Sequence, residues 1–116
     1  MTAFVSLEKT GLWVTNGARD VLLDWLAEHR CVENDARWNW CKSEQYRWSG
    51  CGVDLSDFQT KGIPLRVTKQ ELEQARKEYG QYVSDFIKNV DEMYDGSWTH
   101  QCGSVEARNW FKGNLT

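Results

Sequence analysis

Residues 68–96 read TKQELEQARKEYGQYVSDFIKNVDEMYDG, and this stretch decides the expected fold. Its apolar residues recur at steps of three and four, which places them on one face of an α-helix. Thr68 and Glu71 have the spacing of a capping box, in which each side chain accepts a hydrogen bond from the other residue's backbone. Gly96 can adopt the left-handed conformation that ends a helix. We therefore predict one long helix over about residues 69–95.

One glycine interrupts the long helix. Gly80 lies near its middle, where glycine costs about 1 kcal/mol relative to alanine. Either another backbone packs closely there or the helix bends, and we predict close packing. The stretch contains neither cysteine nor histidine, so we expect this helix to be a scaffold rather than a site.

The rest of the chain predicts strands and a second helix. Residues 3–15 alternate apolar and polar side chains around a central turn, which is typical of a β-hairpin. Asn16 is expected to cap an amphipathic helix over residues 18–30. Residues 63–67 predict a strand at the edge of a sheet, because Pro64 lacks the N–H that a central strand needs.

The middle of the chain is rich in aromatic residues. Side chains alternate along residues 37–48, and we predict a second hairpin with one aromatic face. Residues 54–58 indicate a loop or a short helical turn. A further strand at residues 98–102 and a short helix after Ser104 complete the prediction.

These elements predict an α+β fold in a single globular domain, residues 1–116. A small antiparallel sheet would pack against one long helix in the second half of the chain, at about residues 69–95, with a second helix at about residues 18–30. A mostly helical fold with aromatic loops is the alternative.

Composition and charge narrow the class of protein. The apolar fraction of 41% and the charged fraction of 27% are typical of a soluble globular chain. No apolar run is long enough to span a membrane, and the start of the chain lacks the pattern of a secretory leader. We therefore expect a cytoplasmic protein without membrane contact. The net charge of −3 argues against binding to nucleic-acid phosphates.

The cysteines and histidines suggest a metal site only as an alternative. The four cysteines form no C-x-x-C motif. Two His-x-Cys pairs could together hold a tetrahedral zinc ion; they are His29, Cys31, His100 and Cys102. Ordinary buried thiols are the favoured interpretation. Cys51 lies between two glycines, which would leave its thiol accessible, although a simple loop cysteine is favoured there.

No catalytic motif accompanies these residues, so we predict neither an enzyme nor a cofactor. The strongest functional signal is the high aromatic content, because seven tryptophans exceed what one small core needs. Aromatic side chains interleaved with arginine are typical of protein interfaces. The predicted partner-binding residues combine this cluster with nearby acidic groups: Asp35, Arg37, Trp38, Trp40, Glu44, Tyr46, Arg47, Trp48, Asp54 and Asp57.

Residues 1–58 carry nine Asp and Glu against six Lys and Arg, which favours a partner that is basic at its contact surface. In size, acidity and aromatic content the chain resembles small cytosolic immunity proteins, which neutralise a toxin. The resemblance rests on no motif and assigns no residue. We therefore predict a protein-interaction module of this inhibitor or immunity type, with a zinc-binding domain or metalloenzyme as the alternative.

Overall fold

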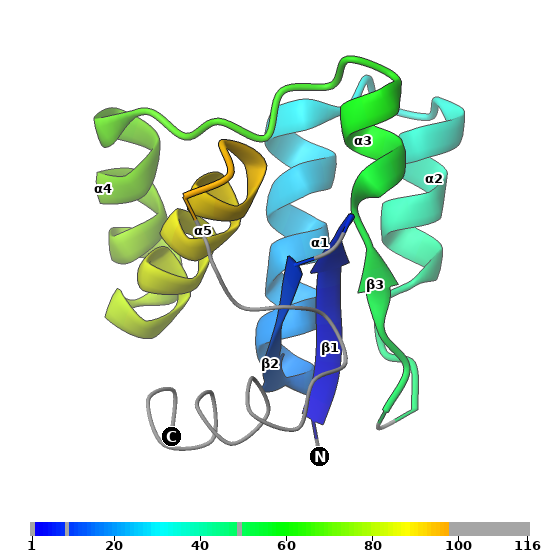
Figure 1. Cartoon of the computed structure of the whole chain (residues 1–116), viewed down its shortest axis with the longest axis horizontal. Coiled ribbons are helices and arrows are strands. Elements are labelled where there is room, and N and C mark those ends of the chain that lie inside the picture. The colour runs from blue at the N-terminus through cyan, green and yellow to red at the C-terminus, as the bar shows by residue number, and fades with distance from the viewer. Residues whose placement is uncertain (1, 9, 49, 98–116) are drawn as a thin grey trace.

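A computed structural model describes residues 2–8, 10–48 and 50–97. This part of the chain folds into a three-stranded sheet, with strand order β2-β1-β3, and five helices (Figure 1). The α+β class predicted from the sequence is confirmed. The predictions for residues 98–116 lie outside the described residues.

The N-terminal hairpin is confirmed. β1 (Thr2–Leu7) pairs antiparallel with β2 (Thr10–Thr15), with Val5 opposite Leu12. The inward side chains of β1 are fully buried, as the alternating pattern requires.

A two-residue strand makes the sheet mixed instead of antiparallel. β3 (Val53–Asp54) pairs parallel with β1, with Val5 opposite Val53. Gly52 permits this approach, because a Cβ at that position would lie 2.6 Å from the carbonyl oxygen of Phe4. So short a strand has no periodicity that a sequence could reveal.

The central helix is α1 (Asn16–Arg30), which lies behind the hairpin in Figure 1 and also contacts α2 and α5. The predicted helix is confirmed, but its cap is Thr15 and not Asn16. The Thr15 hydroxyl accepts a hydrogen bond from the backbone N–H of Ala18 at 3.1 Å. The core-facing side of α1 includes Leu22 and Trp25, both almost fully buried.

The predicted aromatic hairpin over residues 37–48 is wrong. Its first half is a helix, α2 (Ala36–Ser43), which begins where the Asp35 carboxylate accepts a hydrogen bond from the Trp38 N–H at 2.8 Å. Cys41 is fully buried where α2 packs against α1. A short alternating run fits one and a half helical turns as well as a strand, so tertiary packing decided between them.

The segment after β3 contains the expected short helical turn, α3 (Ser56–Thr60). The predicted strand over residues 63–67 is wrong, since these residues form neither helix nor strand. Their N–H groups find other acceptors: Ile63 donates to the Phe58 carbonyl at 2.8 Å, and Val67 donates to the Asp91 carboxylate at 3.1 Å. With those two donors satisfied by other acceptors, they need no strand partner.

The long helix is two helices, α4 (Lys69–Tyr79) and α5 (Gln81–Tyr94), which lie side by side in Figure 1. The chain turns at Gly80, whose φ of +97° and ψ of 170° are available only to glycine. Apart from its two chain neighbours, no described residue has an atom within 4 Å of a Cβ built on Gly80, so the prediction of close packing is wrong. The break lets α5 bury its apolar face while α4 folds back against it.

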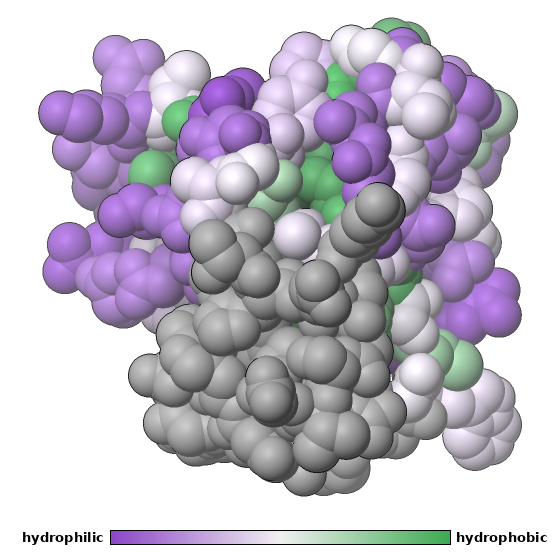
Figure 2. All heavy atoms as spheres, in the orientation of Figure 1, coloured by the Kyte–Doolittle hydropathy of each residue, from purple (hydrophilic) through white to green (hydrophobic). Residues whose placement is uncertain are grey.

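Both predicted ends of this stretch are confirmed. Thr68 and Glu71 form the full capping box, with both hydrogen bonds at 3.1 Å. Gly96 has a φ of +81° just beyond α5. Hydrophilic side chains cover α4 and the α2–α3 side of the face drawn in Figure 2, and hydrophobic ones show only in small areas. Among the described residues, no helix has the length and apolar character to cross a membrane.

Candidate partner-binding surface

The predicted partner-binding residues separate into a first group with roles inside the fold and a second group that is exposed. In the first group, side chains join α2 to α3. The Arg37 guanidinium lies 4.7 Å from the ring centroid of Trp40 and 5.0 Å from that of Phe58, and it pairs with the Asp57 carboxylate. The Trp40 and Phe58 rings meet edge to face at 5.9 Å. These contacts are part of the fold, so they leave little of Arg37 and Trp40 for a partner.

Other predicted residues have local structural roles. Trp38 packs against the core with the ammonium group of Lys42 5.4 Å from its ring centroid. Asp35 caps α2, and Asp54 accepts a hydrogen bond from the Ser56 N–H at 2.9 Å. Glu44 pairs with Arg47 at 3.5 Å, in an ion pair that is half open to solvent on the arginine side.

The second group is exposed and aromatic. Tyr46 is 86% exposed and Trp48 is 85% exposed, and both follow the C-terminal end of α2. Tyr46 has a φ of +62°, a conformation that non-glycine residues rarely adopt. Its N–H donates to the Asp20 carboxylate at 3.0 Å, which holds the backbone in place. We call residues 44–48 the aromatic segment.

A buried arginine side chain holds the backbone of this segment in place. Arg19 is only 1% exposed, yet its guanidinium donates to the carbonyl oxygens of Arg47 at 2.8 Å, Trp48 at 3.2 Å and Cys51 at 3.0 Å. Its Nε also donates to Asp20 at 3.0 Å. The two exposed rings are therefore carried on a backbone that is anchored to α1.

Sequence analysis missed Arg19, because a charged residue on a helix is expected on the solvent side. The three carbonyls that it binds lie 28 to 32 residues along the chain. No pattern of neighbouring residues in the sequence predicts contacts over such a separation.

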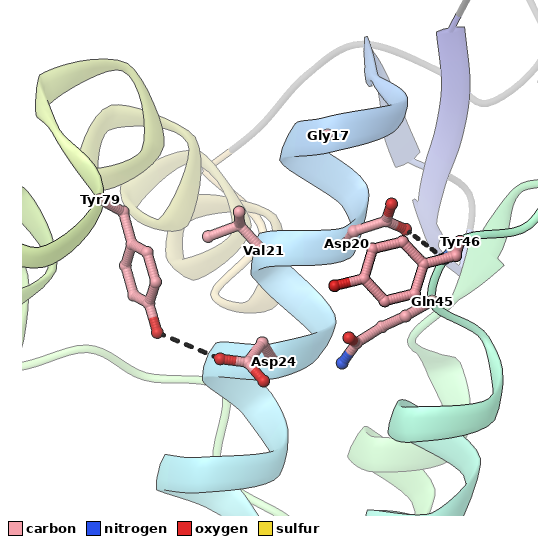
Figure 3. A pocket seen from close by; sticks show the side chains of 7 residues that line it. All are labelled: Gly17, Asp20, Val21, Asp24, Gln45, Tyr46 and Tyr79. Carbon is pink, nitrogen blue, oxygen red and sulfur yellow. Dashed lines mark hydrogen bonds between the residues drawn. The ribbon is translucent and has the colours of Figure 1, made fainter.

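A groove lies beside the aromatic segment (Figure 3). Its volume is about 370 Å³, and one face of α1 supplies Gly17, Asp20, Val21 and Asp24. Tyr79, from the end of α4, flanks one side of this row, and Gln45 and Tyr46 flank the other. Only Tyr46 belongs to the predicted set. The acidic residues of α1 could be read from the sequence only as a solvated helix face.

Hydrogen bonds and charge define the groove. Asp24 accepts a hydrogen bond from the Tyr79 hydroxyl at 3.3 Å and one from the Lys42 ammonium at 2.9 Å. Lys42 also contacts Glu28 at 3.3 Å. Burial, together with the carboxylates of Asp24 and Glu78, raises the pKa of Tyr79 to about 12. Tyr79 is therefore a protonated donor at neutral pH, in a locally negative field.

Burial opposes ionisation of the thiols of Cys31 and Cys41. Burial raises the pKa of Cys31, and it raises the pKa of Cys41 to about 12, so neither is a ready thiolate at neutral pH.

The proposed zinc ligands are only partly described. His29 stacks on Trp25, with ring centroids 5.0 Å apart, and its Nδ1 lies 4.0 Å from a Glu71 oxygen. Within residues 2–8, 10–48 and 50–97, no three side chains of metal-binding type come together. His100 and Cys102 lie outside this part of the chain.

The chain was also compared with known proteins. No protein-family model matches it, and no curated protein or solved structure matches it.

Proposed function

We propose that this chain is a small protein-binding module of the inhibitor or immunity type, which neutralises a partner enzyme or toxin through an aromatic and acidic surface. The observation that carries this proposal is the exposure of Tyr46 and Trp48 on an anchored backbone. Large aromatic side chains in water are candidates for binding, since Trp and Tyr dominate the energetics of protein interfaces. They gain free energy when a partner removes them from solvent.

The anchoring by Arg19 supports the same proposal. Ordering a flexible loop on binding opposes association, and a segment that is already fixed avoids that cost. The hydrogen bonds from Arg19 and Asp20 hold the backbone of Arg47, Trp48 and Tyr46 before any partner arrives.

Charge favours a basic partner. The exposed face of α1 beside the aromatic segment carries Asp20, Asp24 and Glu28, and the whole chain has a net charge of −3. A negative surface steers a positive one during encounter and disfavours acidic competitors. Of the predicted residues, those of the aromatic segment form this surface, whereas Arg37, Trp40 and Asp57 join α2 to α3 within the fold.

The test uses a double variant, Tyr46→Ala with Trp48→Ala. The wild-type protein is immobilised, and proteins that it retains from an extract of its natural cells are identified and purified. We expect a basic protein whose own activity is inhibited by the wild type and at least about tenfold less by the double variant. Tyr82→Ala on α5, which removes a ring that is 41% exposed, is the matched control and should inhibit normally.

Circular dichroism and thermal melting establish that the double variant is folded. Equal inhibition by a folded double variant would contradict the proposal. Retained proteins whose activity is unaffected by the wild type would contradict the inhibitor role.

A further inference from the structure

We propose that the groove beside the aromatic segment binds one arginine side chain of the partner, presented on an extended peptide backbone. This inference rests on the proposed function, because it names the group by which a basic partner is recognised. Lysine would be accepted less well.

The shape of the groove suits a long side chain with a charged end. Val21 provides an apolar contact for the methylene groups of an arginine, between the rings of Tyr46 and Tyr79 (Figure 3). The Tyr46 ring is largely uncovered, and a guanidinium stacks on such a ring better than an ammonium does.

The balance of charge around the groove is negative. Four carboxylates surround it: Asp20, Asp24 and Glu28 on α1, and Glu78 beside Tyr79 on α4. Two cations oppose them: Lys42, which contacts Asp24 and Glu28, and the buried Arg19, which contacts Asp20.

One carboxylate oxygen remains available. Oδ1 of Asp20 accepts from Arg19 and from the Tyr46 N–H, each at 3.0 Å. Oδ2 of Asp20 has no hydrogen-bond partner among the described residues. It offers an incoming guanidinium a charge-assisted hydrogen bond at the edge of the groove.

A second, independent observation indicates a peptide. Nε2 of Gln45 is buried and has no hydrogen-bond partner within the described part of the chain. Figure 3 shows that its side chain points from the Tyr46 side of the groove toward α1. A buried amide donor without an acceptor is costly, and once the Gln45 side chain turns into the groove a backbone carbonyl of a bound peptide would satisfy it. A ligand that brings both a cation and a carbonyl is a peptide arginine, and not a polyamine or a metal ion.

The test is an NMR titration of the full-length protein with the tripeptide Ac-Gly-Arg-Gly-NH2. We expect saturable shifts of the Gly17, Asp20 and Tyr46 amides with a dissociation constant of about 1–10 mM, as suits a single anchor residue. The lysine tripeptide should bind more weakly. The tripeptide with citrulline, which has the shape of arginine without its charge, should bind at least about tenfold more weakly.

Variants connect the binding to the groove. Asp24→Asn and Gln45→Leu should each weaken the arginine tripeptide severalfold, the first by loss of charge and the second by loss of the donor. Glu73→Gln makes the same charge change on an exposed position of α4 and should leave binding unchanged. Spermidine should bind more weakly than the arginine tripeptide, because it cannot accept from Gln45.

Three results would overturn the inference: shifts that do not saturate, citrulline binding as tightly as arginine, or spermidine binding as tightly as the peptide. Each leaves the proposed function standing if the Tyr46 and Trp48 double variant still loses inhibition. If instead the tripeptide binds and the double variant inhibits normally, the groove is real and the inhibitor surface lies elsewhere.

Discussion

Replacing Arg19 by methionine tests the anchoring of the aromatic segment most directly. Methionine keeps much of the side-chain volume but removes four hydrogen bonds, three to the carbonyls of Arg47, Trp48 and Cys51 and one to Asp20. Removing one member of a buried ion pair costs roughly 3–5 kcal/mol of stability, because the other member stays buried and unpaired.

The position of the acceptors places this variant at the lower end of that range. Arg47 and Trp48 are exposed residues, so water reaches their carbonyls after a small local opening. The side chain of Asp20 is only 15% exposed and keeps much of its desolvation cost. We therefore expect the free energy of unfolding to fall by about 3 kcal/mol.

Urea denaturation followed by tryptophan fluorescence and circular dichroism measures this loss. Lys88→Met on α5 is the control, since it removes an exposed positive charge and should change stability by less than about 0.5 kcal/mol. Arg19→Lys keeps the charge but not the fork of donors, and should lie between the two.

Hydrogen exchange supplies a local measurement of the same effect. The N–H of Gly50 donates to the Thr2 carbonyl at 2.7 Å, and the N–H of Cys51 donates to the Trp48 carbonyl at 3.1 Å. Both amides should lose protection in Arg19→Met beyond the global change. A loss of stability below about 1 kcal/mol, with unchanged protection at Gly50 and Cys51, would refute the anchoring role of Arg19.

Further predictions concern stability and thiol reactivity. Gly80→Ala should lower the free energy of unfolding by about 1–3 kcal/mol, because a φ of +97° strains any residue with a Cβ. The control, Gly17→Ala, should be neutral or stabilising. An unchanged denaturation midpoint for Gly80→Ala would show that the turn tolerates alanine. The Arg30 guanidinium lowers the pKa of Glu71 to about 2, so this carboxylate stabilises the fold above its unfolded pKa of about 4.3 and stops doing so as the pH falls to about 2. Glu71→Gln should therefore cost about 1 kcal/mol at pH 7 and nothing near pH 2, and a cost independent of pH in denaturation curves would contradict this linkage. Cys41, fully buried with a pKa of about 12, should resist iodoacetamide at neutral pH until the protein unfolds; mass spectrometry showing rapid native alkylation would contradict its burial.

Local signals in the sequence determined several elements correctly. Alternation around a turn predicted the N-terminal hairpin, and a 3.6-residue period predicted α1. The capping box at Thr68 and the glycine at position 96 marked where helices begin and end. Each of these depends on residues within one or two turns of each other, so the sequence alone contains the information.

The errors arose where local signals were ambiguous. An alternating run in residues 37–41 also fits a helix, and burial of Cys41 against α1 selected the helix. Gly80 is tolerated in a helix interior, so the sequence predicted only close packing or a bend there; the structure has a full break, and α4 and α5 contact each other across it. The nearby Phe58 carbonyl and the distant Asp91 carboxylate accept the N–H groups of Ile63 and Val67, which removed the need for a strand at residues 63–67.

The candidate surface divides in the same way. The sequence by itself named Tyr46 and Trp48 together with Trp38 and Trp40, because an aromatic excess in a small domain predicts some exposed rings without saying which ones. Only the tertiary structure showed that Trp40 packs on Phe58, that Arg19 anchors the aromatic segment, and that Tyr79 faces Asp24 across a groove. Periodicity and caps are properties of neighbouring residues, whereas exposure, burial of a charge and the walls of a groove depend on segments far apart in the chain that folding brings together.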